Sequence, residues 1–154
     1  MRKYGHTMLA VLVLLGLAGG WRQGAAQQKA PAGRTLKVKL RYTGAGTVDQ
    51  KHKILLFVFD TPDFTTRADA MPIGGPESAT AKDETVTFSN VSTSPVYLVA
   101  IYDPTGAYEG MSPPPTGSSL GIYGQAPGQP GPIKIDEGKT AEIDLPFNDS
   151  VKMP

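Results

Sequence analysis

The sequence contains no cysteine, only two histidines and a single tryptophan among its 154 residues. Without cysteine the chain forms no disulfide, and no lipid can be attached through a cysteine. Zinc sites and histidine-based catalysis need several imidazole or thiolate groups. Only His52 lies outside the N-terminal leader described below, so a solvated loop histidine is the simpler interpretation.

The N-terminal residues have the layout of a secretory signal. Arg2 and Lys3 precede an uncharged, mostly apolar stretch of 13 residues, 8–20. Small residues at Gly24, Ala25 and Ala26 predict a signal peptide over 1–26, with cleavage after Gly20 as the alternative. A spanning helix needs about 20 apolar residues. An uncleaved anchor is therefore the lesser alternative to export into the periplasm or outside the cell.

Cleavage after Ala26 changes the charge of the chain. It leaves 12 basic and 14 acidic residues, a formal charge of −2, with no cluster of Lys and Arg. Such a chain has no electrostatic footprint for nucleic acid, so no nucleic-acid partner is expected. No transmembrane segment is expected after cleavage.

The remaining sequence predicts strands separated by turns. Alternation of apolar and polar residues predicts a strand over 35–42. A continuous apolar run predicts a strand buried on both faces over 53–60, and a second long apolar strand is expected over 95–103. Further strands are expected near 78–81, over 84–89, and in a hairpin formed by 133–135 and 140–147 around Gly138. Residues 27–33 are expected to be a flexible linker and 148–154 a frayed C-terminal tail.

A long segment, 104–132, contains seven prolines and seven glycines, which predicts a loop rather than a helix or a central strand. A loop of this length in a compact domain is usually functional or mobile. Together these patterns predict one all-β domain over 34–147, an antiparallel sandwich of two sheets.

Two stretches resemble carboxypeptidase regulatory-like (transthyretin-like) domains. ETVTFSNV followed by PVYLVAIYD matches a pattern that joins two central strands, and I-x-I-x-x-G-K-T-x-x-I-D-L matches the closing hairpin. Ser94 and Pro95 stand where that family has a glycine. The resemblance implies a Greek-key sandwich of the prealbumin or immunoglobulin type and a non-enzymatic module, and it names no ligand. The matching residues are Phe88, Asn90, Val91, Tyr97, Val99, Ala100, Ile133, Ile135, Gly138, Thr140, Ile143, Asp144 and Leu145.

A possible binding surface lies in or beside the Pro/Gly segment. It comprises Tyr102, Tyr108, Met111 and Tyr123, because tyrosines on loops at a sandwich end often bind sugars or peptides. The alternative is that these tyrosines fold back over the core edge. The leading hypothesis is a non-catalytic module that binds carbohydrate, peptide or another envelope protein, or acts as a scaffold.

Two other hypotheses remain open from the sequence. Asp103 and Glu109 suggest a calcium-dependent adhesion or stability module, although calcium prefers six to eight oxygen ligands. No other cofactor is expected. A hydrolase using carboxylate pairs such as Asp136/Glu137 or Asp60/Asp63 is the least favoured, since adjacent strand residues face opposite ways.

Overall fold

The computed structural model describes residues 33–154 except 68, 125 and 127. The predicted signal peptide and nearly all of the predicted linker lie outside the described residues. Seven strands and one short 3-10 turn follow along the chain: β1 (Arg34–Tyr42), β2 (Ile54–Phe59), η1 (Pro62–Thr65), β3 (Glu77–Ala79), β4 (Asp83–Val91), β5 (Tyr97–Tyr102), β6 (Ser119–Ile122) and β7 (Thr140–Phe147). In this part of the chain no helix is long and apolar enough to span a membrane.

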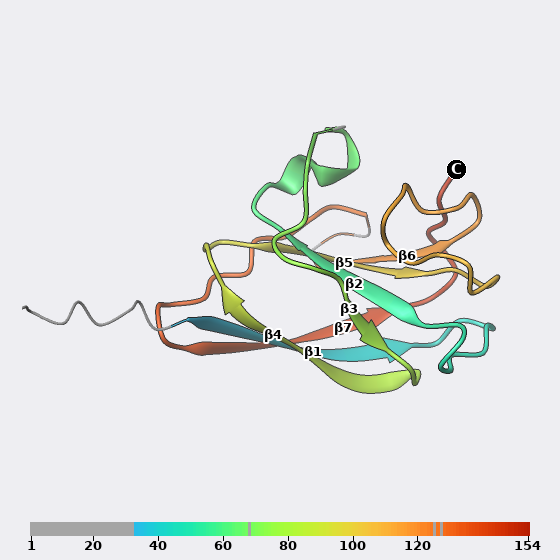
Figure 1. The fold of residues 1–154 in the computed structure, drawn as a ribbon, viewed down its shortest axis with the longest axis horizontal. Helices are drawn as coiled ribbons and strands as arrows, with labels where there is room; N and C mark the ends of the chain where they lie inside the picture. Colours follow the sequence, from blue (N-terminus) through green and yellow to red (C-terminus); the bar gives the residue numbers. More distant parts are fainter. Residues whose placement is uncertain (1–32, 68, 125, 127) are drawn as a thin grey trace, which may run out of the picture.

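The strands form two layers (Figure 1). One sheet has the order β4-β1-β7 and the other the order β3-β2-β5-β6. The main core lies between them and includes Leu36 and Val38 from β1, Leu56 from β2 and Leu98 from β5, none of them exposed. Strand alternation places these side chains on the facing sides of the two sheets. The predicted all-β fold with two sheets is confirmed.

One part of the predicted topology is wrong: the sheets are not purely antiparallel. β1 pairs with β4 antiparallel but with β7 in parallel, from Thr35 opposite Thr140 to Tyr42 opposite Phe147. β7 therefore has no hairpin partner in 133–135. Instead, Ile133 forms an isolated bridge with Val96, and the Ile135 N–H donates to the Ser94 hydroxyl (2.8 Å). Ile133 and Ile135 bury their side chains in the main core, so this segment crosses between the layers.

The Pro/Gly segment and the C-terminal tail also differ from the predictions. Within 104–132, the proline-free stretch 116–126 contains β6, the last strand of the four-stranded sheet. The predicted frayed end is hydrogen-bonded along β6: the Leu120 N–H donates to the Val151 carbonyl (2.9 Å) and the Met153 N–H to the Ser118 carbonyl (2.8 Å). The tail thus lies along the outer edge of this sheet.

The outer face of the four-stranded sheet carries a second apolar cluster. Leu55, Phe57, Val99 and Ile101 are buried there, on the opposite face of β2 and β5 from the main core. This confirms the prediction that the run 53–60 is buried on both faces, and β5 is buried in the same way. The segment 60–76 projects above this sheet (Figure 1), and its Phe64 ring stacks on Phe59 with ring centroids 4.6 Å apart.

Candidate functional site

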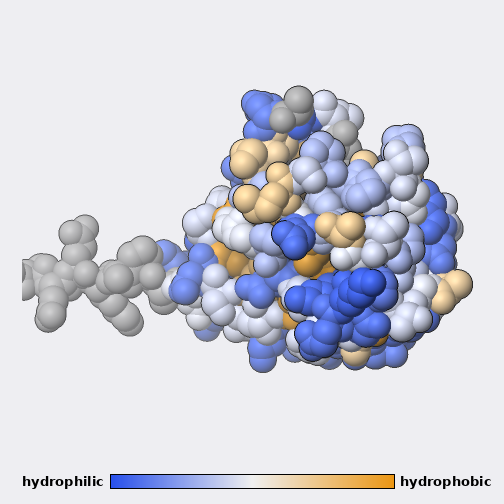
Figure 2. Space-filling model, turned by 45° about the vertical axis from the view of Figure 1, so that its right-hand side comes forward, coloured by the Kyte–Doolittle hydropathy of each residue, from blue (hydrophilic) through white to orange (hydrophobic). Residues whose placement is uncertain are grey.

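A shallow groove of about 460 Å³ crosses the outer face of the four-stranded sheet. It lies between the loop that precedes β2, the start of β3 and the loop that follows β5. Its lining residues are Gln50, Lys51, Lys53, Leu55, Pro76, Ser78, Asp103, Gly106, Tyr108 and Glu109. Figure 2 shows a face of the molecule on which a dense hydrophilic group lies directly below apolar surface that continues towards the projecting loop 60–76.

One wall of the groove is fixed by Asp103, which follows the end of β5 and is 4% exposed. Its carboxylate accepts hydrogen bonds from the Thr105 N–H (2.9 Å) and hydroxyl (2.6 Å), and from the N–H groups of Ala107 and Tyr108, both at 3.0 Å. Burial alone would raise the pKa of Asp103, but these hydrogen bonds outweigh it and hold the pKa below its ordinary value. The loop is therefore folded around a charged carboxylate.

The adjoining wall is fixed in the same way by Asp49. Its Oδ1 accepts hydrogen bonds from the Lys51 N–H (2.9 Å) and the His52 N–H (2.7 Å), and lies 3.0 Å from the His52 Nδ1. The His52 and Lys51 N–H groups lower the pKa of Asp49. His52 thus has a carboxylate partner within its own loop.

The two walls touch each other at Gly106. Its φ is +67°, and a Cβ at this position would lie 2.7 Å from the Lys51 carbonyl oxygen. Glycine permits both the positive φ and the close backbone approach. Because each wall has internal hydrogen bonds and the walls are in contact, the groove is preorganised before any ligand enters.

The floor of the groove is apolar and its rim is charged. Leu55 is 8% exposed, and the Tyr108 ring packs over the outer cluster with its centroid 6.3 Å from that of Phe57. Burial raises the pKa of Tyr108. Lys51, in the turn formed by Asp49, and Lys53, just before β2, both line the groove.

The predicted surface of Tyr102, Tyr108, Met111 and Tyr123 does not exist as one surface. Tyr102 is 2% exposed in the main core, where its hydroxyl donates to the Thr47 carbonyl (2.9 Å). Tyr123 also packs against the main core. Tyr108 instead packs against the outer cluster, and Met111 is 90% exposed. Tyr102 faces the main core because alternate residues of β5 face opposite sides of the sheet, and Tyr108 packs on the other side, so the four residues do not share one face.

One of the two predicted calcium ligands, Asp103, has a role within its own loop. Asp103 and Glu109 both line the groove, but the oxygens of Asp103 are engaged by four donors of its own loop. Among the described residues there is no group of three or more His, Cys, Asp or Glu that could hold a metal ion. The geometry therefore gives Asp103 the role of a loop-fixing acceptor.

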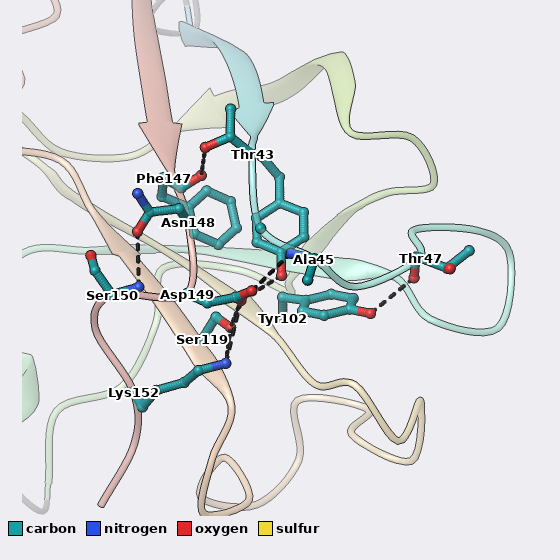
Figure 3. A network of polar contacts seen from close by, with 12 residues as sticks. Thr43, Ala45, Thr47, Tyr102, Ser119, Phe147, Asn148, Asp149, Ser150 and Lys152 are labelled. Carbon is teal, nitrogen blue, oxygen red and sulfur yellow. Dashed lines mark hydrogen bonds and ion pairs between the residues drawn. The ribbon is translucent and has the colours of Figure 1, made fainter.

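A second polar cluster centres on Asp149, at the other side of the four-stranded sheet (Figure 3). Its Oδ1 accepts hydrogen bonds from the Tyr42 hydroxyl and the Ser119 hydroxyl, both at 2.6 Å, and its Oδ2 from the Ala45 N–H at 2.9 Å. Lys152 donates to the Ser119 Oγ at 2.8 Å and lies 3.3 Å from Asp149. The network joins the end of β1, the start of β6 and the C-terminal tail.

Hydrogen bonds and burial in this cluster shift the pKa values of Asp149 and Tyr42 in opposite directions. Hydrogen bonds from Ser119 and Tyr42 hold the pKa of Asp149 far below its ordinary value. Burial, together with the bond that its hydroxyl donates to Asp149, raises the pKa of Tyr42 to about 12. Asp149 is therefore charged and Tyr42 neutral at ordinary pH.

A serine beside a lysine and an aspartate resembles the groups of some hydrolases. Here the serine is not accessible: Ser119 is fully buried, and the groove over β2 and β3 does not include it. Lys152 donates a hydrogen bond to the Ser119 Oγ and lies beside the Asp149 carboxylate, so it is not placed as a base for the serine. The cluster therefore ties the tail to both sheets. Sequence reasoning missed it because Ser119 and Asp149 are far apart in the sequence and lie in segments that were predicted to be irregular.

No protein-family model matches the chain, and no curated protein or solved structure matches it significantly.

Proposed function

We propose that this chain is an exported, non-catalytic β-sandwich module that binds its ligand in the groove over β2 and β3. The observation that carries the proposal is the construction of that groove. Carboxylates at Asp49 and Asp103 fix its two walls. A rigid site loses less conformational entropy when a ligand binds, so this construction favours recognition.

The non-catalytic part of the proposal is supported by the structural role of the carboxylates whose pKa values are shifted. The two carboxylates with the most hydrogen bonds, Asp103 and Asp149, fix loops and the C-terminal tail. Structural networks of this kind shift pKa values without any catalytic role. In each case the shift has a complete explanation in the donors that surround the carboxylate.

The finer fold type and the location belong to the same proposal. A Greek-key sandwich of the carboxypeptidase regulatory-like type rests on the ETVTFSNV and TAEIDL sequence patterns, which fall within β4 and β7, although 133–135 does not pair with β7 as a closing hairpin would. Export to the periplasm or the medium is supported by the basic and apolar N-terminal pattern. Mass spectrometry of the exported protein should give a chain beginning at Gln27. A chain that keeps Met1 and remains in the cytoplasm would contradict export.

The binding function is tested with a combined glycan and peptide array. The purified protein is compared with a Lys51→Ala/Lys53→Ala variant and with Lys37→Ala, a control on the outer face of the other sheet. We expect one class of ligand to bind, the double variant to bind it about tenfold more weakly and the control to bind it normally. Hydrolysis of an ester, peptide or glycoside that one substitution at Ser119 or Asp149 abolishes would refute the non-catalytic proposal.

A further inference from the structure

Two lysines, Lys51 and Lys53, line the groove and form no ion pair within the described part of the chain. Several other lysines and arginines there are also unpaired, whereas Lys39, Arg41, Arg67 and Lys152 each lie within ion-pair distance of a carboxylate. The lysines share the groove with the carboxylates of Asp103 and Glu109, but the Asp103 oxygens are engaged by donors of its own loop. A carboxylate group of a ligand can therefore pair with these lysines.

Glu109 lines the same groove but forms no ion pair with either lysine in the structure. A carboxylate at this place repels a ligand that is anionic throughout. It accepts hydrogen bonds well from hydroxyl groups. Together, the two lysines and Glu109 favour a ligand that combines carboxylates with hydroxyls over a uniformly charged polyanion.

The floor of the groove offers surface on which a sugar ring can pack. Leu55, Pro76 and Tyr108 supply apolar and aromatic surface, while Gln50 and Ser78 supply an amide and a hydroxyl. Extended peptides bind mainly by adding a strand to an exposed sheet edge. The edge strand β3 borders the groove through Ser78, so an acidic peptide is the competing occupant that the test below must distinguish.

We propose that the groove binds an acidic saccharide, whose sugar rings pack on Tyr108 and Leu55 and whose carboxylates pair with Lys51 and Lys53. This inference rests on the proposed binding function and names its ligand class. The volume of about 460 Å³ lies within the range of small-ligand sites. Glu109, Gln50 and Ser78 bind the sugar hydroxyls.

The test is calorimetric titration of the protein with oligogalacturonate. The matched ligand is the same oligosaccharide with its carboxylates methyl-esterified, and poly-glutamate represents an acidic peptide. We expect oligogalacturonate to bind, and esterification to weaken binding about tenfold, as loss of two exposed ion pairs does. Lys51→Ala/Lys53→Ala should weaken it similarly, and Lys37→Ala should not.

Each other result overturns the inference in a distinguishable way. Equal binding of the esterified ligand refutes carboxylate recognition, and tighter binding of poly-glutamate assigns the groove to an acidic peptide. An equal loss of affinity in Lys37→Ala shows non-specific attraction by charge. If oligogalacturonate does not bind while another array ligand does, sensitive to the double variant, the saccharide class is wrong and the binding function stands. If no ligand binds, both proposals are refuted.

Discussion

The Asp149 cluster gives the sharpest stability prediction. Asp149→Asn keeps the size of the side chain but removes its charge and replaces one acceptor oxygen with an NH2 group. In the protein, Oδ1 accepts from two hydroxyls and Oδ2 from the Ala45 N–H. The asparagine can face only one of these two sets with its oxygen. The other set then meets a donor instead of an acceptor.

The size of the effect follows from the number and kind of bonds. A hydrogen bond to a charged group contributes about 1.5–3 kcal/mol to stability. The carboxylate side chain of Asp149 is 32% exposed, which lowers these values. We expect Asp149→Asn to reduce the free energy of unfolding by about 3 kcal/mol. For a domain of this size that lowers the melting temperature by roughly 10 °C.

The measurement is chemical and thermal unfolding at several pH values, with Asp144→Asn on the exposed face of β7 as the matched control. The pKa of Asp149 is lower in the folded protein, so its contribution is complete above the unfolded value of about 3.9 and is lost as pH falls below it. The gap between wild type and Asp149→Asn should therefore narrow as pH falls from 5 towards 2. A variant as stable as the control at pH 7, or a gap that does not depend on pH, would refute the reasoning.

Three further predictions concern the groove, the core and the tail. Gly106→Ala should destabilise the protein by about 1–3 kcal/mol more than Gly117→Ala. Both glycines have positive φ, but only at position 106 would the new Cβ lie 2.7 Å from a backbone carbonyl oxygen. Equal losses of stability in urea unfolding would contradict the contact between the walls. Leu56→Ala should lower the free energy of unfolding by about 2–5 kcal/mol, because Leu56 is fully buried. Met111→Ala should leave it almost unchanged, because Met111 is 90% exposed, and thermal unfolding of the two variants makes the comparison. Deletion of residues 150–154 should increase amide hydrogen exchange at Leu120, whose N–H donates to Val151, and unchanged exchange would show that the tail does not hold β6.

Local sequence patterns were sufficient to predict most of the strands. Alternation in 35–42 predicted β1, and the apolar runs predicted β2, with burial on both faces, and β5. These predictions succeeded because side-chain burial repeats every two residues in a strand. The pairing of β7 with β1 was not predicted. The turn at 136–139 favours a hairpin locally, whereas the core contacts of Ile133 and Ile135 are set by tertiary packing.

The candidate site was predictable only in its parts. Asp103 as an acceptor for its own loop is a local feature, because the four donors lie within five residues of it. The grouping of four aromatic and methionine residues failed because Tyr102 and Tyr123 pack on the inner side of the sheet and Tyr108 on the outer side. The groove brings together loops near residues 50, 77 and 105, and no sequence spacing reveals that proximity.

The proposed binding function depends most on the groove being the place where the ligand binds. The direct measurement is a residue-resolved NMR titration of the protein with oligogalacturonate, following backbone amide shifts. We predict changes confined to residues 50–55, 76–78 and 103–109, which form or support the groove. Changes concentrated on the outer face of the three-stranded sheet, around Lys37 and Lys39, or no changes at all, would contradict it.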